Sequence, residues 1–308
     1  MATVTVNANL ALDIRSLEFS SLYHGVSYST KPDSFVVNYG NGLFDAFAGS
    51  RLTYNANHQL TGGIVTGYLA LLLGIPLLAM GGLHIPATSI GAAAKTASLA
   101  DDHAVIISAL AGNDLLNGGK LNDYLEGFNG NDRLIGNGGA DKLFGDRGAD
   151  VLFGGAGNDY QRGGDDNDTL KGDDGADKLF GDKGADVLIG GKGIDHEWGG
   201  AGNDFFVFNA PRNVANRDYI HDFANISGND DTIRLENAVI PIPGKMGPIN
   251  PDYFFAGTAA HDADDHIIYD EAKGNLFFDS NGDLAGGVTL LAVLTNKPTL
   301  TAADFVVI

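Results

Sequence analysis

Apolar and polar positions follow a nine-residue period through the middle third of the chain. From position 116 to position 206 an apolar side chain recurs at every ninth residue, except where Gln161 and Glu197 stand. Polar or small residues surround each apolar one, which is typical of a very short strand with one inward-facing side chain. The pattern therefore predicts a stack of short strands whose core is the column Leu116, Leu125, Leu134, Leu143, Leu152, Leu170, Leu179, Leu188 and Phe206.

The turns between these strands carry the same period. An aspartate stands two residues before every position of the column, and a glycine stands five residues before each aspartate after the first. The aspartates are Asp114, Asp123, Asp132, Asp141, Asp150, Asp159, Asp168, Asp177, Asp186, Asp195 and Asp204. The first of these glycines is Gly118, and the others are Gly127, Gly136, Gly145, Gly154, Gly163, Gly172, Gly181, Gly190 and Gly199.

This spacing predicts a metal site. Glycine lets the backbone turn tightly and bring carbonyl oxygens toward one point, and the aspartate adds a carboxylate. Hard oxygen donors without imidazole or thiolate are what calcium prefers, with six to eight ligands. The chain has no cysteine, which excludes thiolate metal sites and disulfide scaffolds. We expect the aspartates and the leading glycines to bind Ca²⁺.

The segments Gly154–Asp159 and Gly199–Asp204 both match G-G-x-G-x-D, the first six positions of the nonapeptide G-G-x-G-x-D-x-U-x, and the repeat resembles the RTX (haemolysin-type) calcium-binding family. The resemblance implies a right-handed parallel β-roll in which each ion lies between consecutive turns on one edge. Two nonapeptides make one coil, so the eleven aspartates divide into six on one edge and five on the other. The gaps between them allow at most nine calcium ions. We expect fewer, because Ala109, Leu110 and Leu121 replace turn glycines.

Calcium is expected to control folding of this segment. Stacked carboxylates repel one another until cations bridge them, and the apolar column is a thin core. Metal binding energy then becomes folding energy. Extracellular calcium modules bind at about 10⁻⁴–10⁻³ M, so the repeats would stay unfolded inside a cell and fold outside.

The predicted architecture is mainly β, in three parts. Residues 1–108 are expected to be a small mixed β/α domain that caps the roll, with strands at 35–39, 51–54 and 63–66 and helices after Pro86 and Ser98. Residues 109–208 are the β-roll. Residues 209–308 are expected to be a β-rich cap, with a hairpin at 266–279.

Two features of the last part extend the resemblance. The runs 218–223 and 231–235 resemble the segment that closes the β-roll in serralysin-type proteins. Asp304 followed by apolar residues 305–308 resembles the uncleaved export signal of type I (ABC exporter) substrates, and residues 1–19 contain no apolar stretch of a cleaved signal peptide. An ordinary final strand is the alternative for the tail, and both interpretations are compatible. Residues 279–283 are spaced like an EF-hand start, but a hairpin turn is the preferred interpretation because Leu290 stands where the last glutamate would be.

Sequence motifs favour a protein without catalysis. There is neither an H-E-x-x-H nor a G-x-S-x-G motif. His261, His266, Asp262, Asp264 and Asp265 could bind a metal, but a solvated acidic loop is the preferred interpretation.

Charge narrows the partners. The formal net charge is −20, of which −10 belongs to residues 109–204 with 19 acidic and 9 basic side chains, and this acidity argues against a nucleic-acid partner. We therefore expect a secreted, extracellular or cell-surface calcium-binding protein that acts without catalysis and is exported by a type I (ABC) exporter.

Two alternatives stay open. One is a calcium-dependent, polysaccharide-binding adhesin that uses Tyr23, Tyr39, Tyr54 and Asn55. The other is a membrane-active protein that uses the apolar stretch Tyr68–Met80, although a buried core segment is the preferred interpretation of that stretch because it is too short to cross a bilayer as a helix.

Overall fold

A computed structural model provides the structure of the chain. It describes residues 3–6, 27–31, 34–38, 43–54, 60–72, 75–86, 107, 110–210, 216–282 and 286–308. The chain divides into two compact units, residues 1–139 and 140–308. This division falls inside the repeat segment, and the domain boundaries after residues 108 and 208 stay predictions.

The first unit begins with an antiparallel sheet. Its described strands are β1 (Thr3–Val6), β2 (Ser27–Lys31), β3 (Ser34–Asn38), β4 (Leu43–Tyr54), β5 (Leu60–Leu72) and β6 (Ile75–Pro86). They lie in the order β2-β3-β4-β5-β6-β1. The buried side chains described there are Phe47, Leu52 and Val65. The three strands expected from the sequence are present, each inside or close to a longer one.

Strand β1 connects this sheet to the first repeats. It pairs antiparallel with β6 and parallel with β7 (Leu115–Asn117), so that Val4 lies beside Leu116. Strand β7 in turn pairs parallel with β9 (Arg133–Gly138), and β8 (Tyr124–Glu126) lies between them in the sequence. The open edge of the first repeat strand is therefore covered by a strand from the N-terminus. Of the two helices expected after Pro86 and Ser98, Ile107 is helical, whereas Pro86 ends strand β6 and Leu110 lies in a turn; residues 87–106, 108 and 109 lie outside the described residues.

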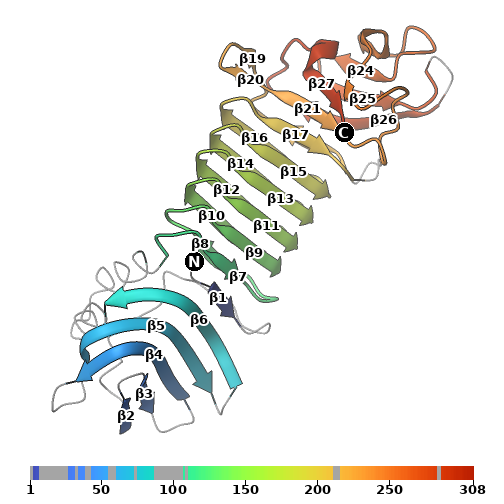
Figure 1. Cartoon of the computed structure of the whole chain (residues 1–308). Coiled ribbons are helices and arrows are strands. Elements are labelled where there is room, and N and C mark those ends of the chain that lie inside the picture. Colours follow the sequence, from blue (N-terminus) through green and yellow to red (C-terminus); the bar gives the residue numbers. More distant parts are fainter. Residues whose placement is uncertain are drawn as a thin grey trace. The chain divides into compact units, whose positions relative to one another are not determined.

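The second unit contains a parallel β-roll (Figure 1). Its strands form two parallel sheets, which we call the even sheet and the odd sheet. The even sheet contains β10 (Lys142–Arg147), β12 (Tyr160–Asp165), β14 (Lys178–Lys183), β16 (His196–Ala201) and β18 (Asp218–Ile220). The odd sheet contains β11 (Val151–Ala156), β13 (Thr169–Asp174), β15 (Val187–Lys192), β17 (Phe205–Phe208) and β21 (Thr232–Leu235). The expected parallel β-roll is confirmed.

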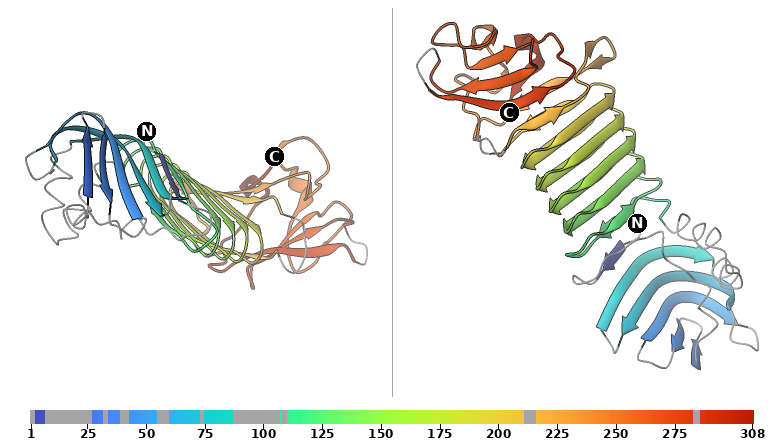
Figure 2. Two further views of the ribbon diagram at one scale, coloured as in Figure 1. Left: turned by 90° about the horizontal axis from the view of Figure 1, so that it is seen from below. Right: turned by 180° about the vertical axis from the view of Figure 1, so that it is seen from behind.

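The nine-residue period explains the roll. Partner strands are aligned with an eighteen-residue offset, so that Leu152 lies beside Leu170 and Leu170 beside Leu188. Every apolar residue of the column from Leu116 to Phe206 is fully buried. Because side chains alternate across a strand, the residues on either side of each leucine face outward and are only half-buried or exposed. The stacking of the coils is visible from both sides (Figure 2).

The C-terminal part extends both sheets. Strand β18 pairs parallel with β16, and β21 pairs parallel with β17, so the runs 218–223 and 231–235 do continue the roll as expected. Strands β24 (Ile267–Asp270), β25 (Asn275–Asp279) and β26 (Val288–Leu294) then form an antiparallel meander, and β26 pairs with β18. The expected hairpin at 266–279 is confirmed.

The smaller elements of this part are also β or 3₁₀. They are β19 (Asn225–Ile226), β20 (Asn229–Asp230), β22 (Gly247–Pro248), η3 (Pro251–Tyr253), β23 (Phe254–Ala256), η4 (Ala302–Asp304) and β27 (Phe305–Val307). The tail is a strand: β27 pairs parallel with β21 and antiparallel with β22. Thr301 and Asp304 form a capping box immediately before it.

Replacing Leu170 by alanine should destabilise the calcium-loaded roll by about 2–5 kcal/mol, because it leaves a cavity between Leu152 and Leu188. Urea unfolding followed by circular dichroism measures this change. The control is Thr169→Ala on the outer face of the same strand, which should change stability by less than about 0.5 kcal/mol. Equal effects of the two substitutions would show that the leucine column is not the core.

Candidate metal centre

The eleven repeat aspartates lie at the ends of turns, and each is followed directly by a strand or by the short extended segment of its repeat. All eleven are at least 97% buried. The nine glycines from Gly127 to Gly199 at the starts of these turns are buried as well. A carboxylate is rarely this buried unless it is hydrogen-bonded and paired with a cation.

One oxygen of each carboxylate from Asp159 to Asp204 joins consecutive coils. The backbone N–H of Asp159 donates to Oδ1 of Asp177 at 2.8 Å, and the N–H of Asp177 donates to Oδ1 of Asp195 at 2.9 Å. On the other edge, the N–H of Asp168 donates to Oδ1 of Asp186 at 2.7 Å. In the first unit, the N–H of Asp114 donates to Oδ1 of Asp132 at 2.7 Å. Aspartates eighteen residues apart therefore share an edge, as the two-repeat coil predicts.

The other oxygen, Oδ2, has no hydrogen-bond partner in the turns that end at Asp159 through Asp204. Among the described residues, Oδ2 is buried and has no hydrogen-bond partner in Asp159, Asp168, Asp177, Asp186, Asp195 and Asp204. A buried carboxylate oxygen without a donor is costly, because it has lost its water and gained nothing in exchange. These oxygens are free to bind a cation.

The leading glycine of each turn makes room at this oxygen. A Cβ atom on Gly172 would overlap Oδ2 of Asp177 and the carbonyl oxygen of Gly190 in the next coil. A Cβ on Gly181 would overlap Oδ2 of Asp186 and the carbonyl of Gly199 in the same way. A carboxylate oxygen and a carbonyl oxygen from two successive coils thus converge on one point, and any side chain at the glycine would fill it.

Other turn positions require a left-handed backbone. At the second position of the turn φ is positive whether the residue is glycine, as at Gly191 (φ 101°), or not, as at Asp182 (φ 73°). Asp166 stands where most repeats have their later glycine and adopts a φ of 80°. Aspartate tolerates this region better than most residues, so the turn keeps its shape there.

The early turns are less regular. Leu121, in place of a turn glycine, is 48% exposed. In the same turn Oδ2 of Asp123 accepts the backbone N–H of Gly119 at 2.6 Å, so this oxygen is used inside the protein. That the Leu121 turn binds calcium less well stays a prediction.

Burial and mutual repulsion raise the pKa values of the repeat carboxylates. Burial raises the pKa of Asp168 and of Asp177 to about 8, and neighbouring aspartates on the same edge add to the rise. Burial likewise raises the pKa of Asp186 to about 7 and that of Asp204 to about 6. Without a cation Asp168 and Asp177 hold protons near neutral pH. A divalent ion at Oδ2 favours the charged form and displaces the protons.

The donor set fits calcium. Carboxylate and carbonyl oxygens converge, and a large, flexible oxygen site is what calcium takes, whereas magnesium demands a tighter octahedron. The residues that would hold the ion are the aspartate of one turn and the backbone of that turn and the next. When bound, calcium neutralises the stacked carboxylates and links successive coils.

The last two turns are closed by residues outside the nonapeptide pattern. The N–H of Asp195 donates to Oδ1 of Asp218 at 3.1 Å, and the N–H of Gly193 donates to Oδ1 of Asn216 at 3.0 Å. On the other edge, the N–H of Asp204 donates to Oδ1 of Asp231 at 3.0 Å, and the N–H of Gly202 to Oδ1 of Asn229 at 3.0 Å. On each edge, one Asn-x-Asp segment therefore takes the place of the next coil.

Sequence reasoning did not assign Asp218 and Asp231 to the carboxylate series. Both have the signal of the repeats, an apolar residue two positions later, at Ile220 and Ile233. They were missed because they follow Asp204 and each other at fourteen and thirteen residues, which breaks the nine-residue period. Asp222 is a third such residue: its carboxylate accepts the N–H groups of Gly199 and Gly200 at 2.9 and 3.0 Å.

The two polar exceptions in the apolar column are buried in the core. Gln161 donates from Nε2 to the carbonyl of Lys171 at 2.6 Å. Glu197 is fully buried, and burial together with Asp218 and Asp195 raises its pKa well above the usual range. Each keeps its place in the register, opposite Leu179 on the neighbouring strand.

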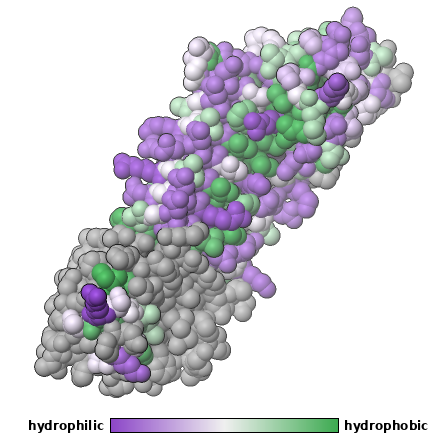
Figure 3. Space-filling model, viewed as in Figure 1, coloured by the Kyte–Doolittle hydropathy of each residue, from purple (hydrophilic) through white to green (hydrophobic). Residues whose placement is uncertain are grey.

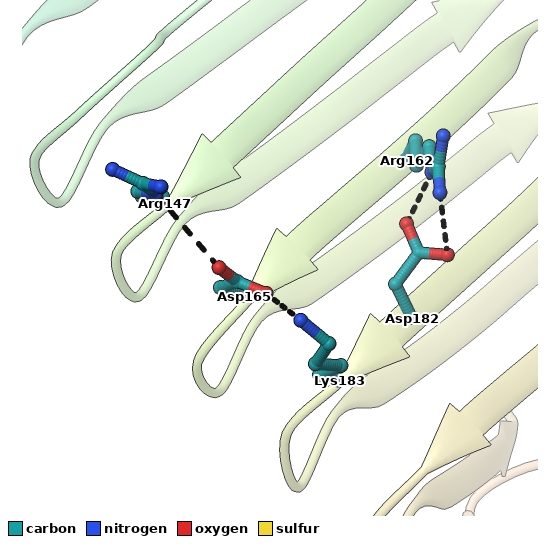
Figure 4. A network of polar contacts seen from close by, with 5 residues as sticks. All are labelled: Arg147, Arg162, Asp165, Asp182 and Lys183. Atoms are coloured by element: carbon teal, nitrogen blue, oxygen red, sulfur yellow. Dashed lines mark hydrogen bonds and ion pairs between the residues drawn. The ribbon is translucent and has the colours of Figure 1, made fainter.

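Charged side chains on the outside of the turns and strands form ion pairs along the roll (Figure 4). Asp165 lies between Arg147, at 3.9 Å, and Lys183, at 2.7 Å. Arg162 of β12 forms a bidentate pair with Asp182 of β14. Such exposed pairs contribute at most about 1 kcal/mol each, so they do not replace the ions at the buried carboxylates.

Outside the roll, His261, Asp262 and Asp265 come within metal-binding distance of one another. The carboxylate of Asp265 already accepts the backbone N–H groups of His261 and Asp262 and so holds this loop. His266 contacts the carbonyl of Asp279 at 2.9 Å instead. Of the residues expected to bind polysaccharide in an adhesin, Tyr54 ends β4, whereas Tyr23, Tyr39 and Asn55 lie outside the described residues.

Fold and site together define a parallel β-roll with calcium-binding turns. Residues 104–125, 126–161 and 162–197 match the family model of the RTX calcium-binding nonapeptide repeat (4 copies). This segment of the chain therefore consists of RTX calcium-binding nonapeptide repeats, and the cofactor that they bind is Ca²⁺.

Among solved structures, the solution structure of the AlgE6R3 subunit from the Azotobacter vinelandii mannuronan C5-epimerase is similar. It is 26% identical over 49% of this chain and 78% of that chain, with a TM-score of 0.33. No curated protein matches the chain.

Replacing Asp177 by asparagine should weaken calcium binding about tenfold or more at the neighbouring sites and lower the number of bound ions. The amide can still accept the N–H of Asp159, so the coil is kept while the charge is lost. Isothermal titration calorimetry measures both quantities. The matched control is Asp174→Asn in the same turn, whose exposed carboxylate pairs with Lys192 and should leave binding almost unchanged. Equal losses in both variants would contradict the site.

Calcium binding at pH 7 should release protons, because Asp168 and Asp177 hold them in the metal-free roll. Since these folded-state pKa values lie above the unfolded ones, the metal-free roll should lose stability as pH rises through about 6 to 8. The calcium-loaded roll should not. Calorimetry in buffers of different ionisation enthalpy counts the protons, and unfolding with and without chelator between pH 5 and 9 gives the stability. No proton release, or metal-free stability that rises with pH, would contradict the assignment.

Proposed function

We propose that this chain is a secreted calcium-binding protein whose β-roll folds when it meets extracellular calcium, and that it acts without catalysis at the cell surface or in the extracellular matrix. The observation that carries the proposal is the series of buried Oδ2 atoms without hydrogen-bond partners in Asp159 through Asp204. A roll built on such atoms is stable only when cations occupy them.

The physical balance favours folding outside the cell. Each sheet of the roll contributes one line of apolar side chains to the core. Gln161 and Glu197 interrupt the line of the even sheet. This core is set against a stack of buried carboxylates that repel one another. Calcium concentrations of about 10⁻⁴–10⁻³ M saturate extracellular modules, whereas cytosolic levels are far lower. The same chain is therefore unfolded before export and folded after it.

Export by a type I (ABC) exporter fits this balance. The supporting sequence is Asp304 with the apolar residues 305–308. In the folded protein these residues form β27, which is held by β21, and β21 is held by strand β17 of the roll. When the roll is unfolded, β27 loses this support and its residues are accessible to a transporter.

Among the residues that the structure describes, no helix has the length and apolar character needed to span a bilayer. The apolar stretch expected to be a core segment contributes to β5 up to Leu72 and to β6 from Ile75, which pair antiparallel.

The full chain should gain β structure on addition of millimolar calcium at pH 8, because only then can the roll close. Circular dichroism before and after chelation measures this gain. Magnesium at the same concentration is the control and should have little effect, because it requires a tighter octahedral site. A β signal that survives complete chelation at this pH would contradict calcium-dependent folding.

A further inference from the structure

The outer face of the even sheet differs from the rest of the roll. Its strands β10 to β18 place aromatic and basic side chains in two rows that run along the roll. One row contains Lys142, Tyr160, Lys178, His196 and Tyr219 in register. The other contains Phe144, Arg162, Phe180, Trp198 and His221, of which the first four are in register and His221 lies beyond them. We call this surface the even face.

The aromatic rings of the even face form a continuous stack. Phe180 and Trp198 lie parallel with ring centroids 4.4 Å apart, and Trp198 and His221 are 4.0 Å apart. Tyr160 extends the series to Phe180 at 5.1 Å, and His196 stacks on Tyr219 at 4.8 Å. All these rings are half-buried. Because they cover one another's faces, they present a rigid apolar floor whose ring edges meet solvent.

Basic side chains stand on and beside this floor. Each of β10, β12 and β14 contributes one to the two rows, namely Lys142, Arg162 and Lys178, all of them exposed. Neighbouring strands are about 4.8 Å apart, so the three cations repeat at that interval along the roll. A cation beside an apolar floor interacts more strongly with an anion than a cation surrounded by water.

The charge of these strands is opposite to that of the protein. Strands β10, β12 and β14 contain five cations (Lys142, Arg147, Arg162, Lys178 and Lys183) and three carboxylates (Asp146, Asp165 and Asp182), a net charge of +2. Strands β11, β13 and β15 of the odd sheet contain two of each, a net charge of zero. The whole chain has a net charge of −20.

Polar residues crowd the edges of the roll, and apolar residues gather over its middle in the space-filling view (Figure 3). The net charge of +2 on β10, β12 and β14 is a local exception on an acidic molecule. A ligand that fits them is anionic, extended along the roll and regularly spaced.

We propose that the even face binds a linear acidic polysaccharide whose sugar carboxylates pair with Lys142, Arg162 and Lys178. The planar guanidinium of Arg162 suits a carboxylate, and it would pair with the sugar carboxylate in addition to its present partner, Asp182. The apolar floor suits the C–H surfaces of the sugar rings between the charges. A nucleic acid fits less well, since its dense phosphates meet only a small net positive charge on an acidic protein.

This proposal rests on the proposed function, because the even face exists only when calcium has folded the roll. It also moves polysaccharide binding from the N-terminal tyrosines to the roll itself.

The chain supplies its own reporter. Trp198 is the only tryptophan and lies in the aromatic stack. Titrating the calcium-loaded full chain with oligogalacturonate at fixed free calcium should change its fluorescence in a saturable manner. The variant Lys142→Ala/Lys178→Ala should bind about tenfold or more weakly. The control Lys171→Ala/Lys192→Ala removes the same charge from β13 and β15 of the odd sheet and should bind like the unmodified protein.

Circular dichroism of each sample shows whether the roll is folded, so a failure of folding is distinguishable from a failure of binding. Neutral dextran should not bind, and added salt should weaken oligogalacturonate binding. A folded protein that does not bind oligogalacturonate would overturn the proposal. So would equal losses in the two double variants, or tighter binding of duplex DNA than of oligogalacturonate.

Discussion

A stack of buried carboxylates at eighteen-residue intervals is the constraint on which the rest of the structure depends. From Asp159 to Asp204 each repeat aspartate uses Oδ1 to accept a backbone N–H of the preceding coil and leaves Oδ2 buried without a donor. An isolated buried charge is unfavourable by several kcal/mol, so the arrangement requires a cation. The glycine before each aspartate and the thin leucine column both follow from it: one leaves room for the ion, and the other closes the coil around it.

The ends of the roll show how this constraint is satisfied where the repeat stops. In the second unit, Asn216 and Asp218 on one edge, and Asn229 and Asp231 on the other, accept the N–H groups that another nonapeptide would have accepted. The side chains of Asn216 and Asn229 thus take over from backbone carbonyls, and Asp218 and Asp231 take over from the next aspartates of the series. In the first unit β1 pairs with β7 and covers the open edge of the first repeat strand. Irregular segments at both ends therefore reproduce single contacts of the regular coil.

Calcium binding and the proposed polymer binding depend on the same periodicity. One repeat places its aspartate in the buried turn. The two side chains on either side of its apolar column residue lie on an outer face of the roll. In the even sheet those outward positions hold stacked rings and lysines, whereas in β11 and β15 of the odd sheet they hold Val151, Val187 and Ile189 beside a single ring, that of Phe153. The ions that neutralise the interior also fix the spacing of the cations outside. A face of this kind can appear only after the roll has folded.

The sequence by itself determined the β-roll, the series of stacked aspartates and the pairing of positions eighteen residues apart, because a strict period leaves one way to bury the leucines and stack the aspartates. It also indicated the hairpin at 266–279 and the closing runs. Only the tertiary structure assigned Asp218, Asp222 and Asp231, since their contacts cross irregular loops whose lengths follow no period. It alone brought Phe180, Trp198 and His221 into one stack, because rings eighteen and twenty-three residues apart become neighbours only when the coils lie on one another.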